Sequence, residues 1–162
     1  MEPEIQLRPA VAADAPAIGA VFDAAVREGW AYLGDVVQEP LFTPQHWEER
    51  VAEYAAPNAL VVATDAEGSI LGFTAVNAEA GELYLLFVDP SHSGRGIGQA
   101  LLGAAHDALR AAGYTESWLY TEERNARAKA VYTAAGYRPD GTVRESVFRG
   151  QALREPRLVK SL

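Results

Sequence analysis

The stretch that decides the fold reads LLFVDPSHSGRGIGQALLGAAHDAL and covers residues 85–109. It passes from an apolar run, through Gly94, Gly96 and Gly98, into a pattern with the period of a helix. Glycine is costly to order and weak in helices, so three alternating glycines at a helix start need a reason. Backbone N–H groups without neighbouring Cβ atoms, together with a helix N-terminus, form a site for an anion such as a phosphate. We therefore interpret this loop as an anion site, to which Arg95 adds a charged donor.

Two well-known phosphate-binding motifs do not fit this loop. The dinucleotide fingerprint G-x-G-x-x-G would need its last glycine where the chain has Gln99 or Leu101. A P-loop that starts at Gly98 would need a lysine directly after Gly103, where the chain has an alanine. Two other interpretations stay open, a turn that merely needs positive φ and a loop that binds another phosphorylated ligand.

Strand and helix patterns alternate along the rest of the chain. Strands are predicted at residues 4–10, 59–64, 70–78, 81–88 and 116–121, with a C-terminal hairpin at 142–159 that turns near Gly150. Helices are predicted at residues 14–30, with Asp14 as N-cap, and at 44–56, 96–112 and 125–136. An aromatic-rich loop or broken helix separates the first two helices.

The connections between these elements predict the sheet. The segment 81–120 is a strand, a helix and a strand, so its two strands are parallel if they pair, with a right-handed crossover. The strands joined by the tight turn at 65–69 are antiparallel. The sequence predicts an α/β fold with a mixed sheet and helices on both faces, in a single domain over residues 1–162.

Composition excludes several classes of function. The 162 residues are 49% hydrophobic and carry a formal net charge of -8, which argues against a nucleic-acid surface. The absence of cysteine excludes a disulfide framework, a thiolate metal site and a cysteine nucleophile, and three scattered histidines predict no metal site. No stretch is apolar enough to span a membrane, and the start MEPEIQLRPA is unlike a signal peptide, so we expect a cytoplasmic protein.

Two blocks of sequence carry a family resemblance. SGRGIG, at residues 93–98, resembles motif A of the GCN5-related N-acetyltransferase (GNAT) superfamily, [Q/R]-x-x-G-x-[G/A], except that Ser93 replaces the first residue. NARAKAVYTAAGYRPDG, at 125–141, is similar to motif B of that family. The resemblance implies a three-layer fold whose mostly antiparallel sheet contains a splayed parallel strand pair. It also implies acetyl-CoA-dependent transfer of an acetyl group to a primary amine of a small molecule or a peptide.

The resemblance further implies how acetyl-CoA binds. The pantetheine arm would pair with backbone groups of residues 86–88, in the gap between the splayed strands. The pyrophosphate would lie on the amides of residues 93–99, and Arg127 is a further basic candidate for the outer phosphates. The residues expected to bind the cofactor are Leu86, Phe87, Val88, Ser93, Gly94, Arg95, Gly96, Ile97, Gly98, Gln99, Asn125, Ala128, Lys129 and Tyr132.

Glu82 is the candidate general base. It stands where histone acetyltransferases of the family place their base glutamate, and strict alternation would put Glu82, Tyr84, Leu86 and Val88 on one face of the strand. A carboxylate must act through water, or with its pKa raised by burial, to deprotonate an amine. An ordinary carboxylate at the strand edge is the alternative role for Glu82. Two rival bases follow the next strand, Glu122 and Glu123.

Tyr132 and Tyr84 complete the predicted catalytic set. Tyr132 matches the general acid of the family, and its alternative role is that of a core aromatic. Proton transfer from a phenol to a thiolate is uphill by roughly 2 kcal/mol, so we expect Tyr132 to stabilise the leaving thiolate mainly by a hydrogen bond. Tyr84 stands where some arylamine-type members carry histidine. Without a cysteine, direct transfer in a ternary complex is favoured.

The sequence gives less information about the acceptor site than about the cofactor site. The resemblance implies that residues 28–42 wall it, and we expect Trp30 and Tyr32 to bind the acceptor together with Glu82. Aromatic and acidic side chains suit a cation, and they equally suit packing. A homodimer through the C-terminal hairpin is compatible with the family pattern. A catalytically silent acyl-CoA-binding sensor or interaction module is the alternative function.

Overall fold

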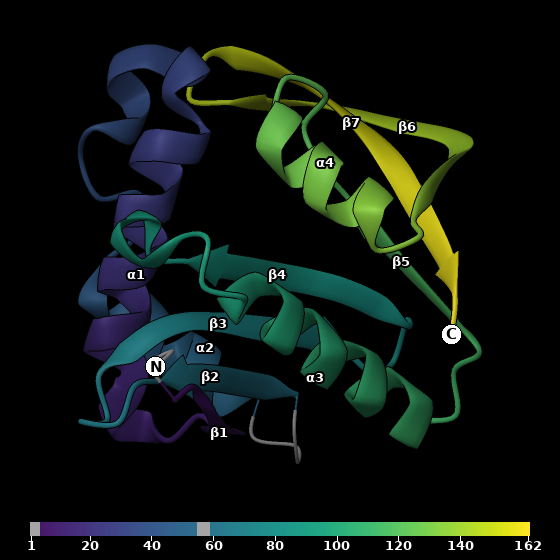
Figure 1. Ribbon diagram of the computed structural model, residues 1–162. Helices are drawn as coiled ribbons and strands as arrows, with labels where there is room; N and C mark the ends of the chain where they lie inside the picture. Colours follow the sequence, from purple (N-terminus) through teal and green to yellow (C-terminus); the bar gives the residue numbers. More distant parts are fainter. Residues whose placement is uncertain (1–3, 55–58) are drawn as a thin grey trace.

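The computed structural model describes residues 4–54 and 59–162 of the chain (Figure 1). Its helices are α1 (Ala15–Gly29), α2 (Pro44–Glu53), α3 (Ile97–Ala111) and α4 (Ala126–Ala134), with short 3₁₀ helices η1 (Ala12–Asp14), η2 (Ala31–Val37) and η3 (Pro90–His92). Its strands are β1 (Gln6–Pro9), β2 (Leu60–Thr64), β3 (Ile70–Asn77), β4 (Glu82–Val88), β5 (Glu116–Tyr120), β6 (Arg138–Phe148) and β7 (Gln151–Ser161). None of the helices in these residues is long and apolar enough to cross a lipid bilayer.

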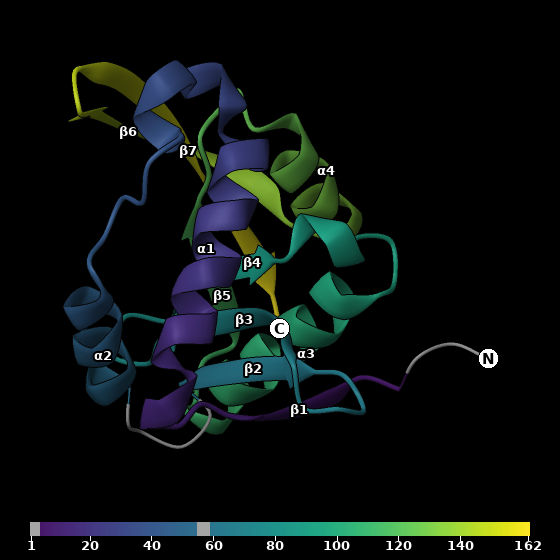
Figure 2. The same cartoon turned by 90° about the vertical axis from the view of Figure 1, so that its left-hand side faces the viewer.

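The strands form one seven-stranded sheet in the order β1-β2-β3-β4-β5-β7-β6. Every neighbouring pair is antiparallel except β4 and β5. Helices α1 and α2 pack on one face around Phe22 and Phe73, and helices α3 and α4 cover the other face around Leu109 and Tyr132 (Figure 2). The predicted mixed sheet with helices on both faces is confirmed.

Strands β4 and β5 separate soon after they meet. Their register contains a single pair, Glu82 with Trp118, and beyond it the two strands diverge (Figure 1). The indole N–H of Trp118 donates to the carbonyl of Ala80 at 2.9 Å and fixes the closed end. The predicted splayed parallel pair is therefore present. Past the closed end, the edge of β4 toward β5 is free to pair with an extended ligand.

A β-bulge at Tyr84 interrupts β4. The register with β3 shifts there, so Tyr84 has no partner on β3. The extra residue leaves Tyr84 beside Tyr54, the residue that follows α2, with ring centroids 6.4 Å apart, whereas Leu86 and Val88 pack on the α3 side. The prediction that Glu82, Tyr84, Leu86 and Val88 share one face is wrong, because strict alternation does not survive a bulge.

Several element boundaries differ from the prediction, and so does the bonding of Asp14, which occupies the predicted N-cap position of α1. Helix α2 ends at Glu53, and the last positions predicted for it, 55 and 56, lie outside the described residues. Strand β6 begins at Arg138, four residues earlier than predicted, and its pairing with β7 is irregular between residues 139 and 143. Asp14 makes no side-chain capping bond to α1; its carboxylate instead accepts two bonds from Arg8, at 2.7 and 2.9 Å.

Candidate active site

The glycine loop takes the shape of a cradle in front of α3. Gly94 and Gly96 have φ of +79° and +77°, a left-handed conformation that favours glycine, so for these two the turn itself requires the residue. Gly98 lies inside the first turn of α3, where glycine is a poor choice. A Cβ there would meet only Val88 Cγ2, at 3.9 Å. Gly98 therefore has no conformational reason to be glycine, and the space beside it is open to a ligand.

A cleft of about 680 Å³ lies between this loop, the end of β4, the end of α1 and helix α4. Most of the predicted cofactor residues line it, from β4, from the loop and from α4. Two of them, Arg95 and Lys129, are not part of the lining, and Lys129 Nζ instead donates to the carbonyl of Glu123 at 3.2 Å. Arg127 does line the cleft, and it also pairs with Glu28 at 3.3 Å.

Asn125 holds the start of α4 at the edge of this cleft. Its side-chain oxygen accepts from the N–H of Ala128 at 3.1 Å, which makes it the predicted helix cap. Because the oxygen is engaged, a ligand in the cleft would meet the NH₂ end of the side chain.

A second cavity, of about 450 Å³, lies between α1, α2, the bulged part of β4 and the β6–β7 hairpin. Glu82 and Tyr84 line it. It shares part of its lining with the first cleft, namely Trp30, Leu86, Phe87, Asn125, Ala128 and Tyr132. Two ligands, one in each cavity, would therefore meet at β4 and Tyr132.

Glu82 is half-buried and faces the second cavity. Burial raises the pKa of its carboxyl group, and the nearby charge of Arg144 offsets part of that rise. It forms no salt bridge with any other residue of 4–54 and 59–162. Leu86 stands four residues further along β4, at most ~13 Å away. A proton taken from an amine near Leu86 would reach Glu82 through water.

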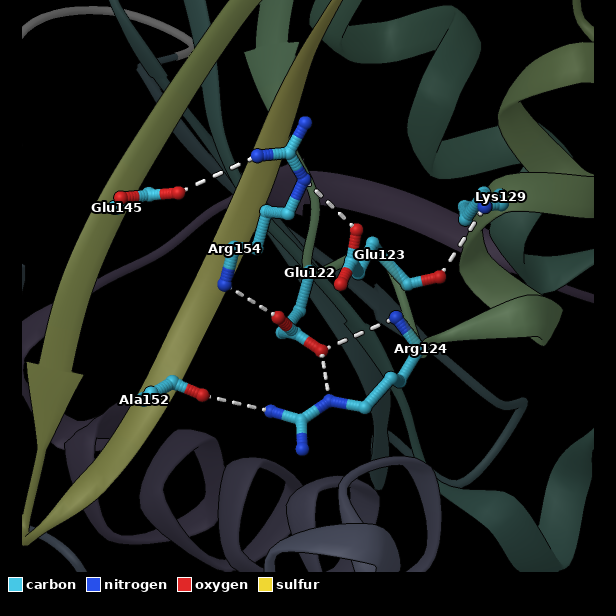
Figure 3. Close-up of polar contacts among 7 residues, drawn as sticks. All are labelled: Glu122, Glu123, Arg124, Lys129, Glu145, Ala152 and Arg154. Carbon is cyan, nitrogen blue, oxygen red and sulfur yellow. Dashed lines mark hydrogen bonds and ion pairs between the residues drawn. The ribbon is translucent and has the colours of Figure 1, made fainter.

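The rival carboxylates are engaged elsewhere (Figure 3). Glu122 accepts from the N–H and Nε of Arg124, at 3.1 and 2.6 Å, and from the N–H of Arg154 at 2.8 Å. Burial alone would raise the pKa of Glu122, but these hydrogen bonds outweigh it and hold the pKa below its usual value. Glu123 pairs with Arg154 Nε at 3.1 Å. Hydrogen bonds to the charged form make Glu122 a poor proton acceptor.

Tyr132 projects from α4 to the junction of the two cavities. It is 8% exposed, and burial raises its pKa, so the phenol is neutral at pH 7 and can donate a hydrogen bond. Its ring packs against that of Tyr137, with centroids 5.7 Å apart. The hydroxyl of Tyr137 in turn bonds His106 and Ser117, each at 2.7 Å, which anchors the wall behind Tyr132.

The other predicted site residues lie in different environments. Trp30 lines both cavities, and Tyr84 is 50% exposed in the second. Tyr32 lines neither cavity and lies 4.8 Å under the guanidinium of Arg124. Burial, with the nearby charge of Glu122, raises the pKa of Tyr32 to about 12.

Sequence reasoning missed the part of the second cavity that the C-terminal hairpin supplies. Arg144 and Phe148 of β6 and Glu155 of β7 line it. The hairpin reaches over the segment after η2, where Arg149 Nη2 donates to the carbonyl of Leu41 at 3.0 Å (Figures 1 and 2). No local sequence pattern predicts a contact between residues that are so far apart in the chain.

The comparisons with known proteins agree with this geometry. Residues 23–137 match the acetyltransferase (GNAT) family, so the chain belongs to that family, as its motifs indicate. A mycothiol acetyltransferase of Clavibacter michiganensis subsp. michiganensis is 45% identical over 94 residues, which are 56% of this chain and 31% of that protein. The chain thus spans about a third of the length of the curated relatives it matches.

Solved structures share the fold over nearly the whole chain. A phosphinothricin acetyltransferase from Sinorhizobium meliloti, in complex with acetyl-CoA, has a TM-score of 0.77 and 22% identity, covering 100% of this chain and 89% of that one. The PaiA N-acetyltransferase from Thermoplasma acidophilum, in complex with coenzyme A, has a TM-score of 0.65 and 18% identity, covering 98% and 99%. The predicted GNAT-type fold is confirmed.

Proposed function

We propose that this chain is an acetyl-CoA-dependent N-acetyltransferase that moves an acetyl group to a primary amine by direct transfer. The observation that carries the proposal is the junction of two cavities at β4 and Tyr132. One cavity begins at an anion cradle and the other contains a carboxylate. The names of the curated relatives, and the coenzyme A and acetyl-CoA complexes among the structural neighbours, support the same chemistry.

The residues present fit the cofactor. The amides around Gly96 and the start of α3 would hold the pyrophosphate, and Gly98 keeps a Cβ out of its space. The backbone of residues 86–88, unpaired on its β5 side, would bond the pantetheine arm as an added strand. When bound, acetyl-CoA would supply the thioester carbonyl and the thiolate leaving group. The set proposed for binding is the one predicted above, with Arg95 and Lys129 outside the cleft lining.

Different groups of the protein carry out the remaining steps, which are deprotonation of the amine and stabilisation of the carbonyl oxygen and of the leaving sulfur. Deprotonating an alkyl ammonium of pKa about 10.4 costs roughly 4 to 5 kcal/mol at pH 7. Glu82 accepts this proton through water, and its raised pKa reduces the mismatch. The amine nitrogen then bonds to the acyl carbon as the carbon–sulfur bond breaks. The N–H of Val88 or its neighbour stabilises the carbonyl oxygen, and the Tyr132 hydroxyl donates to the departing sulfur.

Thioester consumption with a panel of amines tests this proposal. We expect turnover by the wild type, and kcat lower by about 100-fold in both Tyr132→Phe and Glu82→Gln, with coenzyme A affinity nearly unchanged. Coenzyme A, but not ATP or NAD, should stabilise the protein against heat, because only a ligand that binds the native state does so. A protein that binds acetyl-CoA and acetylates no amine would be the silent acyl-CoA-binding module. If Tyr132→Phe and Glu82→Gln are as active as the wild type, the roles proposed for Tyr132 and Glu82 are wrong.

A further inference from the structure

The second cavity has apolar walls over most of its surface. Aromatic and aliphatic side chains from α1, α2, β4 and the hairpin build these walls, among them Phe22, Phe42, Trp47, Phe87, Phe148 and Leu153. Its volume, about 450 Å³, suits a small molecule. His46 adds no charge at pH 7, because burial lowers its pKa and its ring stacks on Phe42 at 4.0 Å. The part of a ligand that lies against these aromatic and aliphatic side chains must be apolar itself, because they offer it almost no hydrogen-bond partners.

The charged side chains of this cavity are paired, with one exception. The pairs are Arg144 with Glu155, Arg124 with Glu122, and Arg50 with Glu53. The N···O distances are 3.1 Å in the first pair and 2.6 Å in the second. Among the lining residues that the structure describes, Glu82 is the charged group left without a salt bridge. The cavity therefore holds one carboxylate without a salt bridge, whose charge the nearby Arg144 offsets only in part.

Resting on the proposed function, we propose that the acceptor is a monoamine with one ammonium group, a ring-sized apolar body and no carboxylate. The single ammonium compensates Glu82, and the apolar body fills the aromatic part of the cavity. The carboxylate of an amino acid would have to compete with Glu155 for Arg144, whose Nε and Nη2 are already engaged, and it would lose water on entering an apolar cavity, which is costly. The second and third ammonium groups of a polyamine would lack partners in the same way.

Glu155 is the residue that enforces the rejection of carboxylates. Its two oxygens accept from Nε and Nη2 of Arg144, at 3.3 and 3.1 Å, while the Arg144 guanidinium lies 4.0 Å over the ring of Tyr120. An uncharged residue at position 155 would leave Arg144 free to pair with a ligand carboxylate. Glu155 is thus a specificity-determining residue, and its loss should change the preference between acceptors.

Phenethylamine and L-phenylalanine make the matched test pair, because they differ by one carboxylate. We expect the wild type to favour phenethylamine by on the order of 100-fold in kcat/KM, and spermidine to be poor as well. In Glu155→Gln this preference for phenethylamine over phenylalanine should fall by about tenfold, because the carboxylate of phenylalanine can then form an ion pair with Arg144. Glu145→Gln is the control, since Glu145 lies on the same hairpin, pairs with Arg154 at 3.3 Å and lies outside the cavity. Glu145→Gln should prefer phenethylamine over phenylalanine by the same factor in kcat/KM as the wild type.

Calorimetric binding of the same amines to the protein saturated with coenzyme A separates this inference from the proposed function. If phenethylamine binds preferentially but is not acetylated, the proposed class of amine is supported and the proposed acetyltransferase activity is refuted. Turnover with phenylalanine or spermidine equal to or better than phenethylamine would refute the acceptor class and leave the acetyltransferase standing. If the wild type and Glu155→Gln show the same ratio of kcat/KM for phenethylamine to kcat/KM for phenylalanine, Glu155 does not determine specificity.

Discussion

Replacing Gly98 by alanine should stabilise the free protein and weaken its binding of coenzyme A. Alanine is better than glycine inside a helix by about 0.8–1.0 kcal/mol, and the gain is about half of that in a first turn. The new methyl group meets only Val88 Cγ2, at an ordinary contact distance of 3.9 Å, so no steric cost opposes the gain. A stabilisation of about 0.5 kcal/mol should raise Tm by about 1–2 °C in a chain of this size.

The same methyl group occupies the space assigned to the pyrophosphate. An anion displaced by one methyl radius moves beyond hydrogen-bond distance of the amides at the start of α3. The loss of one bond to a charged group costs about 1.5–3 kcal/mol, which is tenfold or more in Kd. At a coenzyme A concentration of 100 Kd the wild type gains about 2.7 kcal/mol, and a tenfold weaker variant gains only about 1.4 kcal/mol.

Gly103→Ala is the matched control, because Gly103 lies on the same helix, its added Cβ meets nothing within 4 Å, and it is no part of the cleft. It should stabilise the protein by about 1 kcal/mol and leave coenzyme A binding unchanged. Thermal denaturation with and without coenzyme A measures both effects. A Gly98→Ala protein that keeps the full ligand-induced shift would refute the placement of the pyrophosphate on this turn.

Three further predictions follow from individual side chains. The acid limb of kcat/KM should lie at higher pH than an exposed glutamate would give, because burial raises the pKa of Glu82, and a pH profile of Glu82→Gln should lack that limb. Asp14→Asn should lower the free energy of unfolding in urea by about 1–2 kcal/mol at pH 7. The hydrogen bond from Arg8 lowers the pKa of Asp14, so this stabilisation is complete above the unfolded-state pKa of about 3.9 and is lost as the pH falls through the folded value. Tyr137→Phe should cost about 2–4 kcal/mol in the same assay, since it leaves His106 buried without its 2.7 Å partner, and a loss below about 0.5 kcal/mol would contradict this.

The parts of the fold that local patterns control could be predicted from the sequence. Helical spacing, the Asn125 cap and the glycine loop each depend on a few neighbouring residues, and the structure has them where they were expected. The bulge at Tyr84 could not be predicted, because it depends on the register between β3 and β4 and not on the composition of β4 alone. The cleft at the glycine loop was partly predictable for the same reason, because half of its lining comes from one contiguous strand, loop and helix start at residues 86–99.

The second cavity depends on contacts that join distant parts of the chain. Its walls come from α1, α2, β4 and the β6–β7 hairpin, and the hairpin is held in place by bonds such as the one from Arg149 to Leu41. Such contacts leave no periodic signal, so Arg144 and Glu155 could not be assigned from sequence. The predicted role of Tyr32 also depends on packing that the sequence does not show, because its side chain lies under Arg124 and lines neither cavity.

The choice between Glu82 and Glu122 shows why a site needs structure as well as motif. Both are glutamates beside the same parallel strand pair, and spacing alone leaves both as candidate bases. Glu122 accepts hydrogen bonds from Arg124 and Arg154, which stabilise its charged form and lower its pKa. Glu82 is half-buried without such donors, so its pKa rises toward the range in which a carboxylate can relay a proton. Environments that shift the pKa values of these two carboxyl groups in opposite directions favour Glu82 over Glu122 as the proposed base.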